Sequence, residues 1–242
     1  MKLFGKDLDK ELLVVAEIGV NHEGSLDKAK ELCELAHSAG ADAVKIQLGT
    51  VKGGPERKGG SFALSESEVI QLIEYCNGTG VSLFASAFDF EAVDFCAEFF
   101  PVIKVASRSF EDKPLLMDIC KTDLPVIASV GASAVGAVAE VVALFNEVVL
   151  LHCVPEYPAQ EANLEKMAFL KNIFNTNVGY SDHTLGLDAC YRAVIMGAPV
   201  IEVHFTDDKT REFRDHHLSV EPRELADFVK MTTAYKEKLC RE

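Results

Sequence analysis

Eight short apolar segments alternate with eight amphipathic segments along this chain, and this alternation restricts the fold more than any other feature. The apolar segments are rich in β-branched residues, which is typical of buried strands. We predict these strands at residues 12–19, 43–48, 81–87, 102–107, 125–131, 148–154, 177–181 and 200–206. Apolar strands that alternate with helices indicate a parallel sheet covered by helices. Eight such units are the number that closes a (β/α)8 barrel.

An amphipathic segment follows each predicted strand, and several of these segments begin at a residue suited to capping a helix. Short polar side chains can accept a hydrogen bond from the first turn of a helix. Three such residues are Ser65, Asp89 and Ser133. We predict helices at residues 26–39, 65–79, 89–99, 113–121, 133–145, 164–174, 187–196 and 222–239.

The length of 242 residues suits one α/β barrel, and no linker or low-complexity tract divides the chain. We therefore expect a single barrel domain over residues 1–242. An open doubly wound sheet is the alternative, but no Gly-x-Gly-x-x-Gly pattern follows the first predicted strand. The longest predicted loop, residues 51–61, is glycine-rich and follows the second strand, so we place it at the active face.

Composition excludes several classes of partner. The net charge of −14 argues against broad binding to nucleic acid or to an anionic membrane. No apolar run is long enough to span a membrane, and the N-terminal segment has no signal-like apolar stretch. The seven cysteines form no Cys-x-x-Cys pair, which favours reduced thiols and a cytoplasmic protein.

Polar residues collect at the carboxyl ends of the predicted strands, where barrel enzymes place their chemistry. Reading these strand ends and the loops after them in chain order gives the candidate site residues. They are Glu17, Lys45, Gln47, Ser86, Lys104, Ser107, Ser129, Tyr157, Ser181, Asp182, His183, Glu202, His204 and Asp215.

Two lysines lie inside predicted barrel strands. Lys45 and Lys104 each alternate with apolar neighbours, and a lysine buried there is costly unless an anion pairs with it. The serines and glycines at nearby strand ends could add donors, so the pattern indicates a phosphate and carboxylate site. The alternative is that both lysines extend to carboxylates at the barrel rim.

Two histidines end the seventh and eighth predicted strands. His183 and His204 are spaced as neighbouring strand ends should be, so both imidazoles could reach one metal ion. Two protein ligands would leave positions for water and substrate, as a catalytic ion requires. A mixed imidazole and oxygen site suits Mn²⁺, Mg²⁺, Co²⁺ or Zn²⁺. The alternative is a hydrogen-bonded pair of core histidines.

Two carboxylates are candidates for direct roles. Glu17 could act as a general acid or base or bind a sugar hydroxyl, with a structural salt bridge to Lys45 as the alternative. Asp215 follows the last strand in a charged loop, so it could instead be a solvated loop charge.

Seven segments in order resemble the sialic acid synthase family, whose members condense phosphoenolpyruvate (PEP) with an N-acetylated amino sugar. Together they span almost the whole chain, and their combination is more specific than any one of them. They are AEIGVNHEGS (16–25), AGADAVKIQ (39–47), KVAS (104–107), LLHCVPEYPA (150–159), VGYSDHTLG (178–186), GAPVIEVHFT (197–206) and DHHLSVEP (215–222).

The resemblance implies a (β/α)8 barrel enzyme with a divalent metal held by His183 and His204. It implies that the acceptor sugar is contacted by Glu17, Gln47, Tyr157 and Asp215, and that PEP is held by Lys45, Lys104, Ser107, Ser129 and Ser181. It also implies a homo-oligomer, expected to be a dimer. The family's C-terminal antifreeze-like domain does not follow the barrel here, and we expect it to be a separate protein, absent or removed.

The sequence differs from the family at several positions, and these differences affect the expected identity of the acceptor sugar more than the expected chemistry of PEP. Val154 and Pro155 stand where the family has a threonine and an asparagine or serine, so one phosphate contact is expected to be lost. Arg108 is a candidate replacement charge. Arg57 and Lys58 lie in a loop expected to contact the acceptor, so a phosphorylated acceptor sugar is an alternative. A further alternative is that the chain is a non-catalytic barrel subunit.

Overall fold

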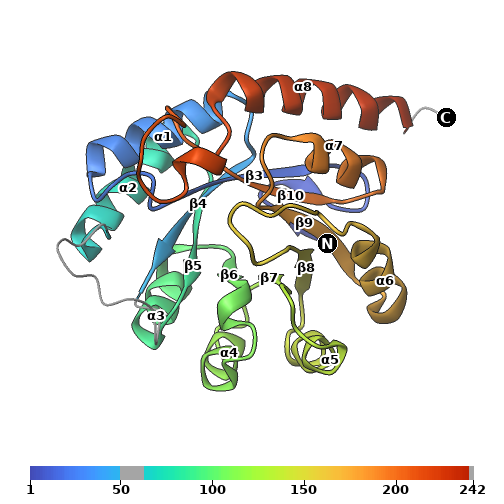
Figure 1. The fold of residues 1–242 in the computed structure, drawn as a ribbon. Coiled ribbons are helices and arrows are strands. Elements are labelled where there is room, and N and C mark those ends of the chain that lie inside the picture. The colour runs from blue at the N-terminus through green and yellow to red at the C-terminus, as the bar shows by residue number, and fades with distance from the viewer. Residues whose placement is uncertain (50–62, 240–242) are drawn as a thin grey trace.

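A computed structural model of the chain describes residues 1–49 and 63–239. Eight parallel strands form a closed barrel in the order β10-β3-β4-β5-β6-β7-β8-β9. The helices form a ring around these strands in chain order (Figure 1). The predicted (β/α)8 barrel is therefore confirmed.

The barrel strands follow the predicted apolar segments closely. Strands β4 and β10 pair with β3 on its two sides, and β10 also pairs with β9, which closes the barrel. The strands are β3 (Leu13–Gly19), β4 (Ala43–Leu48), β5 (Leu83–Ala87), β6 (Ile103–Val105), β7 (Val126–Ser129), β8 (Val148–His152), β9 (Asn177–Asp182) and β10 (Val200–His204).

The helices pack outside the strands and bury their apolar faces against them. Ser65 and Asp89 cap their helices as predicted, whereas Ser133 does not. Helix α5 starts later than predicted, and its cap residue Ala134 makes no side-chain hydrogen bond. The helices are α1 (Leu26–Ser38), α2 (Glu66–Thr79), α3 (Phe90–Phe99), α4 (Lys113–Cys120), α5 (Val135–Leu144), α6 (Glu165–Phe174), α7 (Asp188–Ile195) and α8 (Pro222–Leu239).

A small N-terminal hairpin was not predicted from the sequence. Strands β1 (Lys2–Leu3) and β2 (Lys6–Asp7) are joined by Phe4 and Gly5, both with positive φ. The Phe4 ring lies 5.1 Å from the Phe84 ring of β5. Because Phe84 and Ser86 point to the same side of β5, the hairpin packs beneath the barrel interior, away from the strand ends that carry Ser86.

Close packing inside the barrel depends on one glycine in β9. A Cβ at Gly179 would lie 2.3 Å from the carbonyl oxygen of Val200 and 2.8 Å from Leu151. Any side chain there would therefore force β9 away from β10. The glycine allows the strand ends that carry His183 and His204 to approach each other.

No helix within residues 1–49 and 63–239 has the length and apolar character needed to span a bilayer. The cysteines in these ranges are free thiols. Residues 51–61 of the predicted glycine-rich loop, with Arg57 and Lys58, lie outside the described residues.

Candidate active site

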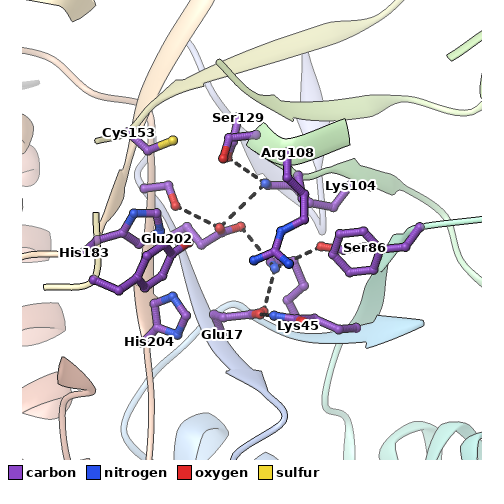
Figure 2. Close-up of a pocket in the computed structure, with 16 residues that line it drawn as sticks. Glu17, Lys45, Ser86, Lys104, Arg108, Ser129, Cys153, His183, Glu202 and His204 are labelled. Atoms are coloured by element: carbon purple, nitrogen blue, oxygen red, sulfur yellow. Dashed lines mark hydrogen bonds and ion pairs between the residues drawn. The ribbon is translucent and has the colours of Figure 1, made fainter. Parts of the chain in front are cut away.

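A pocket lies at the carboxyl ends of the barrel strands, where the sequence places the candidate site residues. Every barrel strand, or the loop that follows it, contributes to the pocket. The lining residues are Glu17, Lys45, Gln47, Ser86, Phe88, Lys104, Ala106, Ser107, Arg108, Ser129, Cys153, Tyr157, Ser181, His183, Glu202 and His204. Figure 2 shows their side chains converging from all sides.

The floor of the pocket is a buried network of two carboxylates and two ammonium groups. Lys45 Nζ lies 2.6 Å from Glu17 Oε2 and 3.9 Å from Glu202 Oε2. Lys104 Nζ lies 3.7 Å from Glu202 Oε1. All four side chains are at most 7% exposed, so the charges are stable there only because they balance one another. Glu202, on β10, joins the two lysines into one network.

Burial and pairing act in opposite directions on these groups. Burial alone would raise the pKa of Glu202, but Lys104, Lys45 and the Ser181 hydroxyl lower it to about 2. Burial would lower the pKa of Lys45, but Glu17 and Glu202 raise it above its ordinary value. For Lys104 burial prevails, and its pKa falls below the ordinary value despite Glu202. Glu202 is thus ionised at neutral pH.

Hydroxyl and amide groups hold this network in place. The Lys104 ammonium donates to Ser129 Oγ at 2.7 Å and to the carbonyl oxygen of Val105 at 3.2 Å. The Lys45 ammonium donates to Ser86 Oγ at 3.1 Å. The Ser181 hydroxyl donates to Glu202 Oε1 at 2.9 Å. Each lysine is therefore fixed by side chains from neighbouring strands, with its head group facing the pocket.

Glu17 has two partners in the pocket. Besides its ion pair with Lys45, it accepts a hydrogen bond from Gln47 Nε2 at 2.7 Å. The salt bridge that the sequence offered as the structural alternative is therefore present. It does not conflict with a catalytic role, because the pair lines the pocket.

The two histidines lie together on the side of the pocket formed by β9 and β10. Their ring centroids are 5.5 Å apart, and the Tyr157 ring lies 4.0 Å from the ring of His183. Burial, and then the neighbouring His204, lower the pKa of His183 to about 4, so its imidazole is neutral. His183 Nδ1 donates to the carbonyl oxygen of Val154 at 2.6 Å, which leaves Nε2 with a free lone pair.

These imidazoles fit a metal site with two protein ligands. A backbone carbonyl that holds the second ring nitrogen is the usual support of a metal-binding histidine. His204 Nδ1 is buried and has no hydrogen-bond partner within the described residues. Among residues 1–49 and 63–239, no group of three His, Cys, Asp or Glu side chains is placed to hold a metal. Water or substrate would have to supply the other ligands.

The chain matches the NeuB family over residues 57–242, which is more than half of its length. The chain belongs to the NeuB family. This finding confirms the resemblance seen in the sequence and the expectation that the chain is an enzyme of this kind.

Relatives and a solved structure agree with this family membership. An uncharacterised protein of Methanocaldococcus jannaschii is 39% identical over 89% of this chain and 68% of its own length. The N,N'-diacetyllegionaminic acid synthase of Campylobacter jejuni is 35% identical over 89% of this chain and 74% of its own length. The crystal structure of an N-acetylneuraminic acid synthetase from Leptospira borgpetersenii superposes with a TM-score of 0.88 at 31% identity, covering 95% of this chain and 85% of that one.

Two predicted site residues of this NeuB-family barrel do not line the pocket. Asp182 follows Ser181 in β9, and successive strand residues point to opposite sides. Its carboxylate therefore accepts hydrogen bonds outside the barrel interior, from Tyr180 Oη at 2.9 Å and from the Cys190 thiol of α7 at 3.0 Å. The expectation that it binds substrate is not supported by this position. Asp215 Oδ2 lies 3.7 Å from His204 Nδ1, beside the pocket rather than in its lining.

Three lining residues were not picked out from the sequence, namely Phe88, Ala106 and Cys153. Cys153 had been interpreted as a core thiol, and it is indeed buried. Burial raises its pKa, and Lys104, the backbone of Gly131 and Ser107 only partly oppose this. Its alternation with Leu151 in the β8 segment was the one available signal that it faces the interior.

Proposed function

We propose that this chain is a PEP-dependent sugar-acid synthase. It would join PEP to an N-acetylated amino sugar in its aldehyde form and release inorganic phosphate. The NeuB family membership and the synthases among its relatives support this proposal. The observation that carries it is a buried pair of lysines and a pair of imidazole side chains that line one pocket.

The lysine side suits the anionic substrate. Lys104 donates to Ser129 and to a backbone carbonyl, which leaves one of its three N–H groups for a ligand. The separations between Glu202 and the two lysines, 3.9 Å and 3.7 Å, are longer than hydrogen bonds. An entering phosphate or carboxylate could therefore bind the ammonium groups without first breaking a hydrogen bond to Glu202. Ser107 and Ser129 line the same side of the pocket.

The histidine side suits a divalent metal, which we propose is held by His183 and His204. The candidates are Mn²⁺ or Mg²⁺, and then Co²⁺ or Zn²⁺. When bound there, such an ion would act as a Lewis acid that polarises the sugar carbonyl. Holding His183 neutral and oriented by Val154 is the contribution of this chain.

In the proposed reaction, C3 of PEP attacks the aldehyde carbon and forms the new carbon–carbon bond. Water adds at C2 of PEP, and the C–O bond to the phosphate then breaks, which leaves a keto group at C2. The aldehyde oxygen gains a proton and becomes a hydroxyl. The water that adds at C2 loses the proton that the aldehyde oxygen gains. We assign the transfer of this proton to Glu17, whose carboxylate lines the pocket and is oriented by Lys45 at 2.6 Å and by Gln47.

The acceptor side of the pocket would be formed by Gln47 and Tyr157, with Asp215 next to His204. The Tyr157 phenol lines the pocket and is a neutral hydrogen-bond donor. Neutral donors and acceptors suit the hydroxyls and the amide of an N-acetylated sugar. A phosphorylated sugar is the alternative acceptor, and it would need cations at this side.

The proposal is tested by phosphate release from PEP by the purified protein with Mn²⁺. The panel contains N-acetylhexosamines and phosphorylated sugars, and each reaction is also run without sugar. Release that depends on an N-acetylated amino sugar is the expected result. Release only with phosphorylated sugars would overturn the acceptor assignment. No release with any sugar, together with no binding of PEP, would favour the non-catalytic alternative.

A further inference from the structure

Arg108 brings a third cation to the pocket, separate from the two lysines. It lies in a short 3-10 turn, Ser107–Ser109, that directly follows β6. Its guanidinium carbon lies 5.9 Å from the centre of the Phe88 ring, which helps to orient a planar cation. Figure 2 shows the side chain extending into the pocket from the β6 side.

Among the pocket residues that the structure describes, no carboxylate pairs with Arg108. The carboxylates of Glu17 and Glu202 balance the ammonium groups of Lys45 and Lys104. Within residues 1–49 and 63–239, none of the ion pairs involves Arg108. By contrast, Arg211 outside the pocket pairs with Glu23 at 2.9 Å. The lining residues therefore present one uncompensated positive charge, and it belongs to a side chain that remains charged at any physiological pH.

The position of Arg108 in the barrel indicates which end of a substrate it would meet. In the closed strand order, β6 and β10 lie four strands apart in both directions, so they face each other across the barrel. Arg108 and Lys104 thus lie opposite His204. Ser107 and Ser129 are on the Arg108 side, where a Cβ at Gly131 would approach the Ser107 Cβ to 2.8 Å. This half of the pocket gathers donors and cations around one small space.

We propose that Arg108 binds the phosphate group of PEP together with Lys104 and Ser129. This inference rests on the proposed function and names the group that selects a phosphorylated enol over its unphosphorylated counterpart. A guanidinium offers two parallel N–H donors to a phosphate, whereas each lysine offers a single point charge. The carboxylate of PEP would then lie deeper, toward Lys45.

Two substitutions and a control test this assignment. R108Q removes the charge, and R108K keeps the charge but loses the paired donors. R192Q is the control, because Arg192 is an exposed arginine in the last turn of α7 and does not line the pocket. Thermal unfolding of each variant shows whether it is folded. Equilibrium binding of PEP, inorganic phosphate and pyruvate is then measured by calorimetry without any sugar present.

We expect R108Q to weaken the binding of PEP and of inorganic phosphate by about tenfold or more, since charge-assisted hydrogen bonds are lost. Pyruvate, which lacks the phosphate, should bind R108Q and the unsubstituted protein equally. The affinity of R108K for PEP and for inorganic phosphate should lie between the affinities of R108Q and of the R192Q control. In turnover with an active acceptor, the KM for PEP should rise more than kcat falls.

Different failures point to different errors. If the unsubstituted protein does not bind PEP, the proposed function fails, and this inference fails with it. If it binds PEP and R108Q matches R192Q, only the Arg108 assignment is wrong. Equal losses for pyruvate and PEP would place the carboxylate at Arg108 and overturn the phosphate assignment. An effect confined to the KM of a phosphorylated sugar would assign Arg108 to the acceptor instead.

Discussion

At the scale of single residues, Glu202 organises the pocket. Its carboxylate lies within 4 Å of both lysines and accepts a hydrogen bond from Ser181. From the sequence alone, Glu202 is only one of the polar residues at the strand ends, and nothing connects it with the lysines. The link arises because β10 lies two strands from β4 and opposite β6 in the closed barrel, and all three side chains point into the interior.

This role predicts that E202Q is strongly destabilised. Removing one partner from a buried charge network leaves the others uncompensated, at a cost of about 3 kcal/mol. The control is E140Q, because Glu140 forms an exposed pair with Lys113, and such pairs contribute little to stability since water screens them. Urea unfolding measures both variants. Equal stabilities would mean that the network does not support the fold.

If the histidine pair binds a metal, replacing one histidine should abolish metal binding without unfolding the protein. H204A should lose metal-dependent turnover by about a hundredfold or more, while its thermal unfolding stays close to that of the unsubstituted protein without metal. H37A, at an exposed position of α1, is the matched control. Metal content after dialysis gives a second measurement. Full activity of H204A in metal-free buffer would contradict the metal assignment.

At the scale of elements, packing between β9 and β10 depends on Gly179. G179A should destabilise the protein by at least about 2 kcal/mol, because its Cβ would lie 2.3 Å from a backbone oxygen. G136A in α5 is the control, since a Cβ there meets nothing within 4 Å and alanine favours a helix. Chemical unfolding should show the two substitutions moving stability in opposite directions. If G179A has the stability of the unsubstituted protein, β9 and β10 can move apart without a cost in free energy.

The elements were predictable from the sequence because their periodicities differ. Each apolar segment gave a strand, and each amphipathic segment gave a helix. The errors arose where one local signal was insufficient. Ser133 is a suitable cap residue, but α5 begins after it. The predicted strand 102–107 ends at Val105, because the chain then enters the 3-10 turn that directs Arg108 into the pocket.

The sequence predicted most of the residues that line the pocket, but not which of them form ion pairs with one another. Strand alternation placed Lys45, Lys104 and the two histidines inside the barrel, where the structure has them. The same alternation directs Asp182, which directly follows the inward Ser181, to the outer side of β9, where its hydrogen-bond partners lie. Which carboxylate meets which lysine depends on distances across the barrel, and no periodicity along the chain encodes them.

At the scale of the whole molecule, an acidic protein carries a pocket rich in cations. The net charge of −14 argues against broad binding to polyanions, yet three cationic side chains line one cavity. The surrounding barrel supplies the buried carboxylates that make two of these charges stable. The proposed binding of a small anion would therefore depend on the pocket rather than on the net charge of the protein.

Global stability should also respond to pH through a buried histidine outside the pocket. Burial lowers the pKa of His152 below its ordinary value of 6.5, although its hydrogen bond to the carbonyl oxygen of Ala162 opposes this. Because the unfolded chain takes up a proton more readily than the folded one, this residue makes stability fall as the pH drops below about 6.5. Melting temperatures between about pH 7.5 and pH 5.5 should decrease less in H152Q than in the control H37Q. If the melting temperatures of H152Q and H37Q fall equally with pH, His152 does not contribute to the pH dependence of stability.

The most direct test of the proposed chemistry uses PEP labelled with ¹⁸O at the oxygen that bridges C2 and phosphorus. The labelled substrate is turned over with an acceptor sugar that supports phosphate release, and the products are analysed by mass spectrometry. Cleavage of the C–O bond after condensation predicts that the released phosphate carries the label and that the sugar acid does not. Label retained in a keto acid would show P–O cleavage and would contradict the proposed synthase reaction.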